Sequence, residues 1–97
     1  MARIDYPDLA DCSAEFRAAA GPKPINIGRM FGHAEPAALG LLFFGGKILN
    51  ETALDPRLRE LVILRVCVHA GCRYEAHQHA GHARTAGVSD DEIARVA

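Results

Sequence analysis

Residues 56–86 are predicted to form two helices joined by a tight turn, and this hairpin constrains the fold more than any other stretch. Asp55 and Pro56 indicate a helix start, because Asp accepts hydrogen bonds from free backbone N–H groups and Pro fits the first helical position. Nothing breaks the helix before Gly71, which permits a chain reversal. The β-branched residues of this run would also suit a strand. Its length and its cap instead favour a helix, buried on most sides.

The second predicted helix runs from about residue 72 to residue 86, and Gly87 ends it. Side chains spaced by three and four residues share one stripe of a helix; here the stripe consists of Cys72, Glu75, His79, Ala83 and Ala86. Glu75 and His79 are four residues apart, so the carboxylate can touch the imidazole. Because the chain reverses before this helix, Glu60 is expected to face the helical turn at residues 79–82. Two carboxylates, an imidazole and a thiol therefore converge in a groove between helices, where sites are often built.

The composition indicates one small domain in a reducing compartment. The chain has 97 residues, 49% of them apolar, and a net charge of −1, which gives no reason to expect nucleic acid or a membrane as a partner. The longest apolar run, residues 36–46, is too short to cross a bilayer. The charged N-terminus lacks the apolar core of a signal peptide. Three cysteines without framework spacing indicate a cytoplasmic protein.

The N-terminal part is expected to hold an arm and a short helix. Residues 1–11 are interpreted as an extended arm, because Tyr6 precedes a proline and is therefore disfavoured in a helix. Asp11 or Ser13 can cap the helix that follows, which continues through Ala20.

Two further helices are expected at residues 25–31 and 36–49. Gly45 and Gly46 lie inside the second of these and weaken it by roughly 1 kcal/mol each. They suggest either a kink or the close approach of another helix. The alternative is that the helix simply ends at Phe44.

A last helix is expected after Ser89, which forms the Ser-x-x-Glu capping box with Glu92. No segment has a convincing strand pattern, and no internal repeat is present. The predicted fold class is therefore all-α.

The hairpin resembles the carboxymuconolactone decarboxylase family, which includes the alkyl hydroperoxidase D proteins. The resemblance lies in LDPRLRELVILRV and in GCRYEAHQHAGHARTAGVSDDEI, and upstream in INIGRMFGHAEPAALGLLFFGGKIL. It covers residues 25–97, most specifically residues 54–93, and leaves residues 1–24 as an N-terminal arm and short helix. The resemblance implies a helical bundle of the alkyl hydroperoxidase D-like type and a homo-oligomer, often a trimer or hexamer. Family members usually continue further, so this chain is expected to be a short or truncated version.

The branch of the family is indicated by one substitution. The peroxidase branch uses Glu-x11-Cys-x2-Cys-x3-His, and this sequence supplies Glu60, Cys72 and His79 at those spacings. Glu75 occupies the second cysteine position, so the disulfide cycle of that motif cannot run. Whether Cys67 could replace the missing thiol cannot be judged from spacing. The pattern instead resembles the decarboxylase-like branch, which implies that an acid and a His transfer protons on a lactone carboxylate.

Each candidate also has a plainer interpretation. Glu60 could be a first-turn carboxylate favoured by the helix dipole, or could pair with Arg57 or Arg59. A thiol at a helix N-terminus can be a nucleophile, as Cys72 would be, but a partly buried cysteine is more often inert packing. Glu75 on an open helix face would be an ordinary surface residue.

Residues that bind substrate are expected at the start of the second helix and near its middle. Arg73 and Tyr74 could hold a carboxylate or phenolate, although an arginine stacked on a tyrosine is also common on surfaces. His82 is assigned to the same group. His69, Cys72, His79 and His82 could, together with Glu75, hold zinc or iron, but their spacing matches no standard pattern, so no metal is expected. No organic cofactor motif is present.

Three functions remain open at this stage. The preferred one is acid–base chemistry on a small lactone or organic acid, with Glu75 and His79 as the proton-transfer pair and Glu60 as a relay. The second is a thiol-dependent alkyl hydroperoxidase-like antioxidant activity that uses Cys72 and an external thiol. The third is a non-catalytic oligomerisation or binding module.

Overall fold

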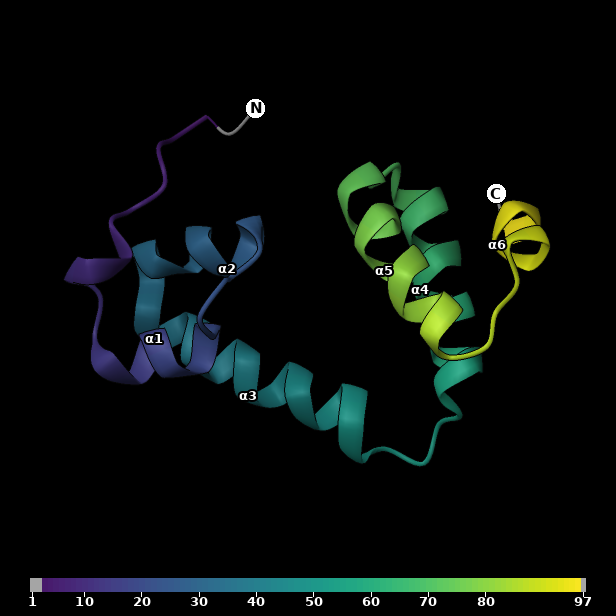
Figure 1. The fold of residues 1–97 in the computed structure, drawn as a ribbon, viewed down its shortest axis with the longest axis horizontal. Helices are drawn as coiled ribbons and strands as arrows, with labels where there is room; N and C mark the ends of the chain where they lie inside the picture. Colours follow the sequence, from purple (N-terminus) through teal and green to yellow (C-terminus); the bar gives the residue numbers. More distant parts are fainter. Residues whose placement is uncertain (1–2, 97) are drawn as a thin grey trace. The chain divides into compact units, whose positions relative to one another are not determined.

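The computed structural model describes residues 3–96, and across these residues it contains helices and no strand. The α-helices are α1 (Ala14–Ala20), α2 (Asn26–Met30), α3 (Glu35–Glu51), α4 (Pro56–Ala70), α5 (Arg73–Thr85) and α6 (Asp90–Val96), with two 3₁₀-helices, η1 (Leu9–Asp11) and η2 (Phe31–Ala34) (Figure 1). The predicted all-α class is confirmed. The chain divides into two compact units, residues 1–52 and residues 53–97.

The N-terminal unit is organised around Phe16, whose side chain is fully buried. α1 begins where predicted, because the hydroxyl of Ser13 accepts a hydrogen bond from the Phe16 amide at 3.1 Å. Phe16 packs with Cys12 and Ala38, so the first helix and α3 share one core. The prediction of an extended arm is wrong at η1, where the Asp8 carboxylate caps a short 3₁₀ turn.

α3 continues through both of its central glycines, which confirms the predicted helix and rules out the alternative of an end at Phe44. A side chain at Gly45 or Gly46 would meet nothing within 4 Å, and the suggested close approach of another helix is therefore not found in this unit. The close approach occurs instead at Gly32, where a Cβ would lie 2.8 Å from Pro7 and 3.0 Å from the Cys12 sulfur.

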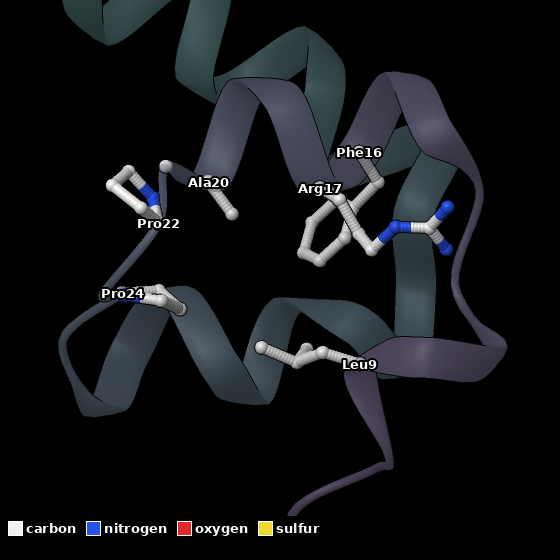
Figure 2. Close-up of a pocket in the computed structure, with 7 residues that line it drawn as sticks. Leu9, Phe16, Arg17, Ala20, Pro22 and Pro24 are labelled. Carbon is white, nitrogen blue, oxygen red and sulfur yellow. The ribbon is translucent and has the colours of Figure 1, made fainter.

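A pocket of about 250 Å³ lies in the N-terminal unit and is mostly apolar. Figure 2 shows Phe16, Ala20 and Leu9 around this space, with Pro22 and Pro24 at one side. The one charged residue in the lining, Arg17, donates hydrogen bonds to the carbonyl groups of Ala10 and Cys12. The guanidinium of Arg17 therefore binds backbone carbonyl groups. The pocket contains none of the predicted site residues.

The C-terminal unit begins with α4, capped as predicted by Asp55, whose carboxylate accepts from the Leu58 amide at 3.0 Å. One face of α4 is buried through Glu60, Leu64 and Cys67. The opposite face is open, and the side chains of this row are at least half exposed: Leu58, Val62 and Val66. The prediction that this helix is buried on most sides is therefore wrong for the single chain. α4 has apolar residues on two faces, and α5 and α6 cover only one of these faces.

α4 and α5 end in the same way. Gly71 and Gly87 have φ values of 62° and 87°, in the left-handed region that glycine adopts without strain. At the end of α4, the Cys72 amide donates to the Cys67 carbonyl at 2.9 Å and the Gly71 amide donates to Val68 at 3.1 Å. This pair of bonds is the Schellman motif.

α6 begins with a capping box, and an ion pair connects the helix to α4. The Ser89 amide donates to the Glu92 carboxylate at 3.0 Å, and the Glu92 amide donates back to the Ser89 hydroxyl at 3.3 Å, which confirms the capping box. Arg57 of α4 bonds the same carboxylate. Among the helices of residues 3–96, none combines the length and the apolar character that a membrane span requires.

Candidate functional site

A buried carboxylate lies between α4 and α5. The Glu60 residue is 1% exposed, although a glutamate is rarely so deeply buried unless it is paired. Its Oε2 lies 2.7 Å from Nδ1 of His79, and its Oε1 accepts a hydrogen bond from Nε of Arg59 at 3.0 Å. The predicted meeting of Glu60 with the second helix is confirmed, and so is the alternative that it pairs with Arg59. The two contacts occur together.

The charge state of Glu60 follows from these contacts. Burial alone raises the pKa of Glu60, but the hydrogen bonds from His79 and Arg59 outweigh burial and hold the pKa below its usual value. Glu60 is therefore ionised near neutral pH and can only accept hydrogen bonds. Nδ1 of His79 must then carry a hydrogen and donate a hydrogen bond to the Glu60 carboxylate. The other ring nitrogen, Nε2, is left as the atom that can take up or release a proton.

Glu75 lies on the other side of the imidazole. Its Oε2 is 3.7 Å from Nε2 of His79, longer than a direct hydrogen bond and short enough for an ion pair. Exposure rises along the line of residues, from 2% for the Glu60 side chain to 17% for His79 and 36% for Glu75. The imidazole of His79 therefore lies between the buried carboxylate of Glu60 on its Nδ1 side and the solvent-accessible carboxylate of Glu75 on its Nε2 side.

The three predicted substrate-binding residues of α5 differ in their exposure and in their distance from His79. The rings of His79 and His82 lie 5.4 Å apart between centroids, tilted by 55°, and His82 is exposed. Tyr74 is partly buried. Arg73 is exposed and does not share the stripe of Glu75, because residues two apart on a helix point in different directions. The roles of these three residues in substrate binding stay predictions.

The thiol predicted for the same groove lies at the start of α5. Cys72 lines a shallow depression of about 240 Å³ together with Cys67, Val68, Gly71, Arg73 and Ala76. The lining of this depression does not include Glu60, His79 or Glu75. Burial raises the pKa of the Cys67 thiol, and the nearby Cys72 and Glu75 raise it further. The two groups of residues are therefore neighbours in electrostatic terms, although they face different spaces.

The sequence left open whether Cys67 lies close to Cys72, and the backbone of the helix end now answers this. The signal that could have found it is the glycine at position 71. A left-handed glycine after a helix predicts a Schellman motif, and that motif brings the residues four before and one after the glycine together. Within residues 3–96, no three His, Cys, Asp or Glu side chains are arranged to hold a metal ion.

The model of one protein family, described as the carboxymuconolactone decarboxylase family, matches residues 29–97. The match includes α4, α5 and α6 and therefore every candidate site residue. No curated protein and no solved structure matches the chain significantly.

Proposed function

The chain belongs to the carboxymuconolactone decarboxylase family, and we propose that it performs acid–base chemistry on a small lactone or organic acid. Glu75 and His79 are the proposed proton-transfer pair, and Glu60 is a positioning residue. One observation carries this proposal. An ionised, buried Glu60 binds Nδ1 of His79, which leaves Nε2 free to exchange a proton beside Glu75.

The proposed roles follow the needs of a decarboxylation. When a carboxylate leaves as CO₂, the electron pair of the broken bond stays on carbon, and that carbon must take up a proton. A protonated Nε2 of His79 is the proposed donor. Glu60 holds the ring in place for this transfer, because its carboxylate accepts the hydrogen bond from Nδ1 at 2.7 Å. Glu75, which is open to solvent, then returns a proton to the ring or accepts one from the substrate.

The substrate is proposed to approach from the exposed side of Glu75. Arg73, at the first turn of α5, does not share the stripe of Glu75. It is therefore the candidate partner only for a substrate carboxylate that extends beyond this stripe, which a guanidinium can bind through two parallel hydrogen bonds. His82 is the candidate second contact, since its exposed ring already touches His79. Neither role requires a metal or an organic cofactor.

The test of this proposal is the decarboxylation of carboxymuconolactone, followed by ultraviolet absorbance. Glu75→Gln keeps the size of the side chain and removes its ability to carry a proton as an acid. We expect the rate to fall by about tenfold to a hundredfold. The matched control is Glu51→Gln, which makes the same change at an exposed ion pair with Lys47 in the N-terminal unit. Equal rates in the wild type and both variants would remove Glu75 from the mechanism.

Self-association of the chain stays a prediction, and the open face of α4 supports it. Leu58, Val62 and Val66 follow one another at four-residue intervals, and their exposed fractions are 51%, 57% and 59%. A second copy of this chain is the proposed partner for that row, because such a contiguous apolar surface is typical of an interface.

A further inference from the structure

Both oxygens of the buried Glu60 carboxylate have a partner. Oε2 lies 2.7 Å from Nδ1 of His79 on α5, and Oε1 accepts a hydrogen bond from Nε of Arg59 on α4 at 3.0 Å. Within residues 3–96, these two side chains are the charged or titratable groups that act on the carboxylate. Glu92 of α6 pairs with Arg57 instead. The state of Glu60 therefore depends on Arg59 as well as on His79.

Arg59 supplies the permanent positive charge of this cluster. An arginine stays protonated in proteins, whereas a histidine ring is neutral over part of the physiological pH range. A carboxylate that is 1% exposed is costly to keep ionised without a positive partner. When the His79 ring is neutral, Arg59 is therefore the group that balances the negative charge of Glu60.

The Arg59 side chain has to bend in order to make this contact. Consecutive residues of an α-helix point about 100° apart, so neighbouring side chains do not normally face each other. Arg59 can reach Oε1 because its long side chain folds back toward the next residue of α4. The side chain is 19% exposed, against 40% for Arg57 two residues earlier. The bend thus moves Arg59 out of water and directs its Nε to Glu60.

The two contacts together orient the carboxylate. The terminal torsion of a glutamate has a broad energy minimum, so one contact alone leaves the plane of the carboxylate poorly fixed. With Arg59 on Oε1, the other oxygen is directed at Nδ1 of His79. An ionised carboxylate only accepts hydrogen bonds, so the hydrogen of the neutral ring belongs on Nδ1.

We propose that Arg59 is a positioning residue for His79: it holds Glu60 as an oriented anion, and this anion keeps the ring hydrogen on Nδ1 and leaves Nε2 to exchange a proton. The role rests on the proposed function, in which Nε2 works beside Glu75. The charge of Glu60 and its contact with Arg59 can nevertheless be measured without a substrate.

The loss of Arg59 is expected to act first on the proton of Glu60. Burial raises the pKa of Glu60, and the contacts with His79 and Arg59 together lower it below its usual value. Without Arg59 the lowering is incomplete, so the carboxyl takes up a proton at a higher pH. A protonated carboxyl can donate its hydrogen to Nδ1. The ring hydrogen then belongs on Nε2, and this atom can no longer accept a proton.

The first experiment follows the carboxyl carbon of Glu60 by ¹³C NMR through a pH titration of the full chain. Arg59→Met keeps a long side chain and removes its charge. We expect the wild-type midpoint to lie below the ordinary value of a glutamate, and to rise by at least about one pH unit in Arg59→Met. The matched control is Arg65→Met on the same helix, which removes an exposed guanidinium bonded to the Val96 carbonyl. This control is expected to keep the wild-type midpoint.

The second experiment needs no variant. Because Nε of Arg59 donates to the Glu60 carboxylate, the ¹⁵N–¹H signal of this group is expected to shift at the same pH as the Glu60 carboxyl carbon in the wild-type protein. An Arg59 signal that does not respond to this titration overturns the proposal. So does a Glu60 midpoint that is the same in the wild type and in Arg59→Met.

The pH profile of lactone decarboxylation separates positioning from a purely structural role. A structural role of Arg59 lowers the rate alike at every pH. The positioning role moves the acid limb of the profile to higher pH in Arg59→Met, by the same amount as the Glu60 midpoint, and by less in Arg59→Lys, which keeps a charge. A rate that falls without a shift of the acid limb contradicts the positioning role. A wild type without any turnover contradicts the proposed function alone, and the two NMR measurements then still decide the role of Arg59.

Discussion

Replacing His79 by alanine is expected to lower the rate of lactone decarboxylation by about a hundredfold to ten-thousandfold, the usual contribution of a positioned acid–base group. The physical reason is that the ring connects the two carboxylates. Its Nδ1 is bound by Glu60 at 2.7 Å, and its Nε2 lies 3.7 Å from Glu75. Without the ring, no other group in this line can deliver a proton between them.

The matched control is His77→Ala on the same helix. His77 is exposed, and it differs from His79 by two residues, so it points away from Glu60. This variant is expected to keep the wild-type rate. Rates are compared by ultraviolet absorbance, after circular dichroism has established that both variants are helical. A folded His79→Ala protein with the wild-type rate would exclude the imidazole from catalysis.

Replacing Glu60 by alanine is expected to lower the free energy of unfolding of the C-terminal unit by about 2–3 kcal/mol. Removal of a buried carboxylate leaves a cavity, and it also leaves His79 and Arg59 without the anion that both contact. Their side chains are 17% and 19% exposed, so water relieves part of the penalty. The expected loss is therefore at the lower end for a broken buried pair.

Glu75→Ala serves as the comparison, because its carboxylate is exposed to solvent and pairs more loosely. We expect it to change the free energy of unfolding by less than about 1 kcal/mol. Urea denaturation monitored by circular dichroism measures both variants. Equal losses for Glu60→Ala and Glu75→Ala would mean that burial of Glu60 does not contribute to stability.

The same carboxylate sets a pH dependence with a definite sign. Its pKa is lower in the folded protein than in the unfolded chain, so ionised Glu60 favours folding. This contribution is complete above the unfolded value of about 4.3 and is lost as the pH falls through the lower folded value. Urea midpoints of the wild type should fall more steeply in acid than those of Glu60→Gln.

The caps of the helices and the central contact were predictable because they depend on local chemistry. Asp55 and the pair of Ser89 and Glu92 mark helix starts through hydrogen bonds to the adjacent backbone. The reversal at Gly71 then fixes which residues of the two helices can meet, and Glu60 meets His79 as a consequence. These features need only the helical repeat and the position of one turn.

Other features depend on what each face packs against, which the pattern of residues does not reveal. Val62 and Val66 are as apolar as Leu64, yet only Leu64 is covered within the chain. The glycines of α3 were expected to mark a kink or the contact of another helix, with an end of the helix as the alternative. The helix does not end there, and no contact is found within the N-terminal unit. The spacing of Cys67 and Cys72 did not reveal their proximity, which follows from the backbone hydrogen bond at the end of α4.

The most direct test of the account is the proton on His79, observed by ¹⁵N–¹H NMR correlation of the imidazole nitrogens in the wild-type protein. An ionised Glu60 at Nδ1 predicts that the neutral ring carries its hydrogen on Nδ1 and leaves Nε2 without one. If the neutral ring instead carries its proton on Nε2, then Glu60 does not hold His79 as described, and the proposed relay is contradicted.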